Sequence, residues 1–198
     1  LDQLHVLYPG DAYMQACDVF AINGTWYFQI LNTLTNPSGS QQGQGTVRGC
    51  QFSNSNHQQA HNVYWDENNH VADFFYVGQW GYQDLNSLPQ GITVPDAACN
   101  PVPFSPAANW LHVVYPDSNK QLSDLYWNGS QWNYQNLYEL VKSSTGVSVP
   151  APQGAVSILG LFFVVFRDEN DELSSILYNG QDWVYQNLSQ MAVTKNKG

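Results

Sequence analysis

The sequence predicts an all-β protein built from four similar units, a β-propeller of four blades. The segment HVVYPDSNKQLSDLYWNGSQWNYQNL at residues 112–137 recurs 51 residues later as FVVFRDENDELSSILYNGQDWVYQNL, and related segments begin at His61 and His5. The composition is that of a β protein, with 7 Trp, 12 Tyr and 9 Phe but only 11% charged residues. Strand-rich repeats of roughly 40–50 residues are typical of propellers. We expect a single domain, 1–198, with repeats of about 51 residues near 1–46, 47–98, 99–150 and 151–198.

Each unit is expected to hold four strands, and the third unit shows them most clearly. A weak inner strand at 105–110 precedes the strands LHVVYP, QLSDLYW and QWNYQNLY. Turns are expected at 117–119 and at Asn128-Gly129, because Asn-Gly is a strong hairpin signal. The same dipeptide recurs at Asn23-Gly24 and Asn179-Gly180. Large apolar residues on both faces of the third strand favour a sheet packed between two neighbours.

The two ends of the chain predict how the ring closes. The sequence opens with LHVLYP, which corresponds to the second strand of a repeat, so the first unit lacks its inner strand. Residues 191–194, Met-Ala-Val-Thr, follow the last repeat and could supply that strand. Ring closure by this C-terminal strand would remove the exposed edges. The rival arrangement is an eight-bladed ring shared by two chains, which would be a homodimer.

Charge and hydropathy argue against several classes of partner. The formal net charge of −10 argues against nucleic acid, whose phosphates need Lys and Arg. It argues equally against anionic membrane surfaces. No run of 18 apolar residues occurs, so we expect no membrane insertion.

Two features favour a secreted protein. The chain starts at Leu1 rather than Met, as it would after removal of a leader. Glycosylation sequons occur at Asn23, Asn128 and Asn187.

Three cysteines, Cys17, Cys50 and Cys99, allow one disulfide. Cys50 and Cys99 each lie near the start of a repeat, so we expect these two to pair, the alternative being that both are free.

Three of the four units carry the same three candidate ligand-binding residues. These are His5, Asp18 and Trp26, then His61, Asp73 and Trp80, then His112, Asp124 and Trp132. In the fourth unit Phe163 and Ser175 replace His and Asp together, which indicates that the two act as a pair. One interpretation is a buried hydrogen bond that joins adjacent strands. The other is an inter-blade sugar site, because hydroxyls bind planar polar groups and the apolar sugar face stacks on aromatic rings. A further recurring carboxylate, at Asp66, Asp117 and Asp168, is expected to form turns.

The repeat also resembles that of the fungal fucose-binding lectins, six-bladed propellers typified by the orange-peel mushroom lectin. The resemblance covers most of each unit and lies in the V-Y strand, the following strand and the [N/D]-G-x-x-W hairpin. It implies a sugar site between neighbouring blades, formed in that family by an Arg, a Glu and a Trp. These fall here on the His series ending in Phe163, on the Asp series ending in Ser175, and most nearly on the Trp series ending in Trp183. Since no unit keeps the Arg or the Glu, the resemblance implies the fold and not fucose specificity.

We therefore predict a non-enzymatic, lectin-like module with glycans as partners, up to three equivalent sites and no cofactor. No catalytic motif can be placed in the sequence. The alternative is a carrier for a small organic ligand, a pigment or a metal ion, held in the central channel or in one degenerate pocket. For a metal, His5, His61 and His112 could converge if their strands lie near the axis.

Overall fold

The computed structural model consists of four antiparallel sheets that follow one another along the chain. It describes residues 4–9, 16–22, 25–31, 48–53, 58–154, 156–158, 162–179 and 181–195. The first sheet contains β1 (Leu4–Pro9), β2 (Ala16–Ile22) and β3 (Thr25–Ile30). The second sheet contains β4 (Arg48–Ser53), β5 (Gln58–Trp65), β6 (Val71–Tyr76) and β7 (Trp80–Asp84). The third contains β8 (Val102–Ala107), β9 (Trp110–Pro116), β10 (Leu122–Trp127) and β11 (Trp132–Asn136). The fourth contains β12 (Ser157–Ile158), β13 (Phe163–Arg167), β14 (Leu173–Tyr178) and β15 (Trp183–Asn187).

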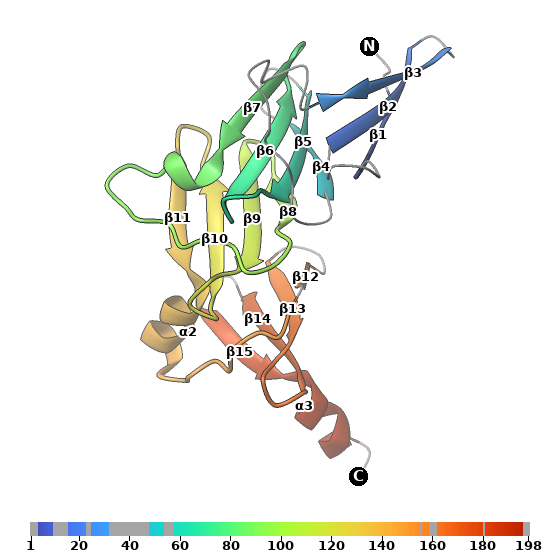
Figure 1. Ribbon diagram of the computed structural model, residues 1–198. Coiled ribbons are helices and arrows are strands. Elements are labelled where there is room, and N and C mark those ends of the chain that lie inside the picture. Colours follow the sequence, from blue (N-terminus) through green and yellow to red (C-terminus); the bar gives the residue numbers. More distant parts are fainter. Residues whose placement is uncertain are drawn as a thin grey trace.

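Within each sheet, the strands pair in chain order. β4 and β12 each lie beside β8, so the first strands of successive sheets are neighbours. Figure 1 shows the sheets in sequence, from the N-terminal end at the top to the C-terminal end at the bottom. This arrangement confirms the all-β expectation and is compatible with a propeller.

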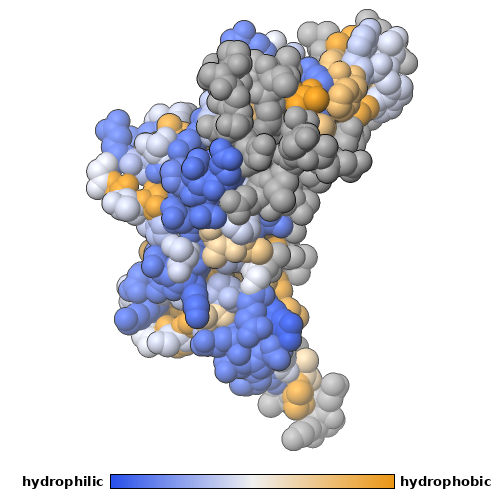
Figure 2. All heavy atoms as spheres, viewed as in Figure 1, coloured by the Kyte–Doolittle hydropathy of each residue, from blue (hydrophilic) through white to orange (hydrophobic). Residues whose placement is uncertain are grey.

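The core lies between the sheets rather than in one central mass. One layer joins Leu31 to Tyr64 and Phe74 of the second sheet. The next joins the second and third sheets, and the last joins the third and fourth. In the view of Figure 2, polar side chains cover most of the described surface of the last three sheets. Both faces of an inner sheet are therefore buried, as the apolar residues on both faces of its strands predict.

The expected closing strand at residues 191–194 is wrong. Residues Leu188–Lys195 form a helix, α3, which lies beside β14 of its own sheet. The side chain of Asn187 accepts a hydrogen bond from the backbone N–H of Gln190, 2.9 Å away, as an N-cap does. The two ends of the chain lie at opposite ends of the molecule in Figure 1, and the described residues do not form a closed ring.

A second helix replaces the predicted end of the strand at QWNYQNLY. The strand β11 stops at Asn136, and α2 (Leu137–Thr145) follows. The Asn136 side chain caps α2 by accepting from the N–H groups of Tyr138 and Glu139, and Gly146 ends it with a φ of 73°. A short 3-10 helix, η1 (Leu85–Ser87), follows β7 at the corresponding place.

The turn predictions for the aspartate series and the third unit are confirmed. Asp117 Oδ1 accepts hydrogen bonds from the N–H groups of Asn119 and Gln121, at 2.9 and 3.0 Å. Asp66 and Asp168 make the same pair of bonds in their own turns. The turn at Asn128 is closed by its N–H donating to the carbonyl of Gln131. The inner strand of the third sheet runs over 102–107, three residues earlier than expected, and the turn at Asn23-Gly24 lies outside the described residues.

The expected disulfide between Cys50 and Cys99 is not formed, because Cys99 is a free thiol. In the strand register, Cys50 of β4 lies opposite His61, near the middle of β5. The residue before Cys99 instead donates its N–H to the carbonyl of Pro116, at the far end of β9. The two cysteines therefore lie at different heights in neighbouring sheets, whereas a disulfide needs Cα atoms within about 7 Å. No helix in the described part of the chain is long and apolar enough to cross a membrane.

Candidate functional site

The second and third sheets each contain a hydrogen-bonded set made of a buried carboxylate, an amide and an imidazole. His61 Nδ1 lies 2.7 Å from Asp73 Oδ2, and His112 Nδ1 lies 2.8 Å from Asp124 Oδ2. Asp73 is 0% exposed and Asp124 is 1% exposed. The strand register explains the contact, because Asp124 faces Val114 and its diagonal neighbour on β9 is His112. The hydrogen-bonded pair predicted from the sequence is therefore present in both sheets.

A glutamine completes each set, and the sequence reasoning missed it. Gln83 donates to Asp73 and Gln135 donates to Asp124, over 2.8 and 2.7 Å. In the first sheet Gln29 donates to Asp18 in the same way, over 2.8 Å. The side chain of His5 lies outside the described residues. A signal was available, because W-x-[Y/F]-Q recurs in all four units at residues 26–29, 80–83, 132–135 and 183–186.

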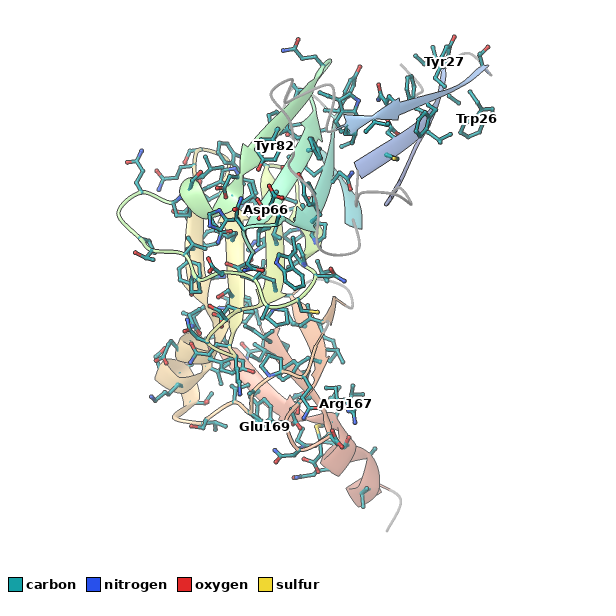
Figure 3. The ribbon with its side chains drawn as sticks, in the orientation of Figure 1. Trp26, Tyr27, Asp66, Tyr82, Arg167 and Glu169 are labelled. Carbon is teal, nitrogen blue, oxygen red and sulfur yellow. The ribbon has the colours of Figure 1, made fainter. Side chains whose placement is uncertain are left out.

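The tryptophans of the last three units pack in the layers between sheets. Trp80 packs with Tyr64 and Phe74 on the face of the second sheet that meets Leu31 of the preceding unit. Trp132 packs into the layer between the second and third sheets, and Trp183 into the layer between the third and fourth. Trp132 therefore lies on the side of its sheet that faces His61 of the preceding unit, and the two residues line the same cavity. Trp26 is 56% exposed and projects from β3 at the end of the molecule (Figure 3).

One cavity in the described structure combines these groups, and we call it the His61 cavity. It has a volume of about 180 Å³ and lies between the second and third sheets. The second sheet contributes Gln59, His61, Phe75 and Gln83 to its lining. The third sheet contributes Leu111, Trp127 and Trp132. The imidazole of His61 is fixed from both sides, because its Nε2 also lies 3.1 Å from Gln59 Oε1.

His61 and His112 do not converge as the metal alternative requires, and the side chain of His5 lies outside the described residues. His61 and His112 lie on β5 and β9, each one strand away from the inner strands β4 and β8. Their Nδ1 atoms are engaged by separate aspartates. Within the described residues, no three His, Cys, Asp or Glu side chains are grouped as metal ligands would be.

Comparisons with known proteins give a shared fold. The chain matches no family model and no curated protein by sequence. Its structure resembles the NanB sialidase of Streptococcus pneumoniae, with a TM-score of 0.52 and 8% identity over 88% of this chain. A second NanB structure, in complex with Optactamide, gives 0.51 and 8%. The chain covers only 29% and 28% of the length of these two proteins.

A fucose lectin from Kordia zhangzhouensis, solved with methyl-fucoside, is also similar, with a TM-score of 0.46 and 11% identity. That match covers 67% of this chain and 89% of the lectin. At these identities, the comparisons concern the arrangement of sheets alone.

Proposed function

We propose that this protein binds a carbohydrate, and that the His61 cavity is the site. The observation that carries the proposal is the composition of the two walls. One wall offers the side-chain amides of Gln59 and Gln83 beside the ring of His61, whose two nitrogens are already bonded, while the other offers the rings of Trp127 and Trp132. Sugar hydroxyls take planar polar partners, and the C–H face of the ring stacks on aromatic side chains.

Size and charge narrow the class of sugar. A volume of about 180 Å³ is below the roughly 300–1,000 Å³ of pockets that hold drug-sized ligands, so the cavity suits one sugar residue. Among the described residues, no Lys or Arg lines it, and the chain carries a net charge of −10. An anionic sugar would meet no compensating charge, so we infer a neutral monosaccharide unit.

The same site supports binding rather than catalysis. Glycoside hydrolysis uses two carboxyl groups on opposite sides of the scissile bond. The carboxylate nearest the cavity, Asp73, is fully buried and already accepts from Gln83 and from the backbone N–H of Asn62. Its role is to orient His61. We therefore propose a lectin-like module with glycan partners, acting outside the cell.

The experiment is a panel of methyl glycosides of fucose, galactose, mannose and N-acetylglucosamine, with sialic acid as the anionic control, measured by saturation-transfer NMR. Trp127→Ala should weaken binding of the active sugar at least tenfold, a loss of about 1.4 kcal/mol, because it removes one stacking face. The control is Tyr27→Ala, which removes an exposed aromatic ring of the first sheet that does not line the cavity, and it should leave binding unchanged. Absence of signal from every neutral sugar at millimolar concentration would refute the proposal.

A carrier function for a small aromatic molecule is the second candidate. Three of the lining residues, Phe75, Trp127 and Trp132, are aromatic, and a flat ring would contact all of them. The absorbance spectrum of protein from its native source separates the two functions. A visible chromophore would favour the carrier, whereas a colourless protein that agglutinates cells would favour the lectin.

A further inference from the structure

The position between the third and fourth sheets corresponds residue by residue to the His61 cavity. His112, Tyr178 and Trp183 stand where the cavity has His61, Trp127 and Trp132, each 51 residues further along the chain. The buried set of imidazole, carboxylate and glutamine is also retained, through Asp124 and Gln135. We call this the His112 position.

The ring of Phe162 fills the His112 position. Phe162 is the counterpart of Leu111, which lines the His61 cavity. Its ring centroid lies 4.8 Å from that of His112, 6.0 Å from that of Tyr178 and 5.8 Å from that of Trp183. A side chain of the protein itself therefore contacts the histidine and both aromatic rings that correspond to the open site.

Two irregularities mark this contact as more than core packing. His112 is 2% exposed, yet its Nε2 has no hydrogen-bond partner among the described residues. Gln59 supplies that partner to His61, but its counterpart here is Trp110, whose ring stacks on His112 and offers no acceptor. In addition, Phe162 has a φ of 54°, a left-handed conformation that bulky residues rarely adopt. Such strain clusters at ligand sites.

The fourth sheet shows what the chain does where the polar set is not needed. There, Phe163 and Ser175 replace the histidine and the aspartate together. The third sheet has His112, Asp124 and Gln135 even though the Phe162 ring lies against His112, and an unpartnered buried nitrogen is unfavourable. A ligand hydroxyl at the Phe162 ring's place would satisfy that nitrogen.

We propose that the His112 position is a second binding site for a neutral sugar, which the ring of Phe162 keeps closed. This inference rests on the proposed function, since it gives the second site the same ligand class. The sugar would stack on Trp183 and Tyr178 and bond to His112 Nε2. The described part of the last three sheets then has one open site, the His61 cavity, and a change of the Phe162 rotamer or residue type adds another.

The test follows the indole N–H signals of the tryptophans by NMR during titration with each of the four neutral methyl glycosides of the panel, those of fucose, galactose, mannose and N-acetylglucosamine. Trp127 and Trp132 report on the His61 cavity, and Trp183 reports on the His112 position. In the wild type, saturable shifts should occur at Trp132 and not at Trp183. Phe162→Leu, which installs the residue found at 111, should add a saturable shift at Trp183 and leave that at Trp132 unchanged.

Two further variants complete the test of the closed site. Phe162→Ala gives the same expected gain if the Leu variant folds poorly, and thermal melting checks both. Adding His112→Ala to Phe162→Leu should abolish the gained shift at Trp183 alone. No gain at Trp183 in either folded variant, or a shift at Trp183 already in the wild type, would overturn the closed-site inference. Absence of a shift at Trp132 in the wild type would instead overturn the proposed function, so the two failures are distinguishable.

Discussion

The hydrogen bond between His112 and Asp124 predicts a strongly non-additive double mutant. His112→Phe removes one of the two side chains that bond Asp124 Oδ2 and leaves only Gln135. Removing one partner of a buried pair lowers the free energy of unfolding by about 3–5 kcal/mol. Because the bond from Gln135 is retained, we expect the loss for this variant to lie near the lower end of that range. Asp124→Ser strands the imidazole instead, at a cost of about 1–3 kcal/mol. The double variant copies the Phe163 and Ser175 of the fourth sheet.

Because both changes remove the same interaction, the double variant should lose about 2 kcal/mol less than the sum of the single losses. Urea denaturation gives the three free energies of unfolding. Thermal melting provides a check, at about 2–4 °C per kcal/mol for a chain of this size. His70→Phe combined with Asp124→Ser is the control pair. His70 bonds to Asp84 and not to Asp124, so the losses in free energy of unfolding of the two single variants should add. Losses at His112 and Asp124 that add within about 0.5 kcal/mol would show that the two side chains do not act as a unit.

Three further predictions concern other parts of the fold. Burial lowers the pKa of His70, but its hydrogen bond to Asp84 and nearby carboxylates raise it more, so the net pKa is raised. The stabilisation from His70 should therefore be complete at acid pH and be lost as the pH rises through the pKa of His70 in the folded state. The difference in melting temperature between the wild type and His70→Gln should accordingly become smaller from pH 5.5 to pH 8.5. Asn136→Ala should lower stability by about 1 kcal/mol in urea denaturation by removing the α2 cap, and an unchanged midpoint would contradict this. Deleting residues 191–198 should change the melting temperature little, because Met191 and Val193 are 45% and 57% exposed; a large drop would mean that α3 has a structural role.

The parts of the site that could be predicted from sequence are those fixed within one unit. His112 and Asp124 are joined by the register of two adjacent strands, so their simultaneous loss in the fourth unit identifies them as a pair. The glutamine was equally local but has no charge and occurs in all four units, so no pattern of loss marked it. Gln135 directly faces Asp124 across β10 and β11.

The sequence could not predict the contacts between units. An alignment of repeats gives the height of Trp132 in its sheet, but not which neighbouring sheet its ring meets. The ring-closing strand failed for a local reason, because the apolar segment at 191–194 suits a strand or a helix equally. The N-cap at Asn187, matching Asn136 before α2, was the signal that favoured a helix.

The pairing of strands in chain order also bears on how the protein folds. Within each sheet, every strand after the first pairs with the strand directly before it in the chain, so the paired strands are joined by short turns. Proteins dominated by such contacts fold faster than those that must close long loops. A sheet can pair while the next one is still being synthesised, and the hydrophobic layer between them forms once the following unit arrives. The repeat thus favours cotranslational folding from the N-terminal end, one sheet at a time.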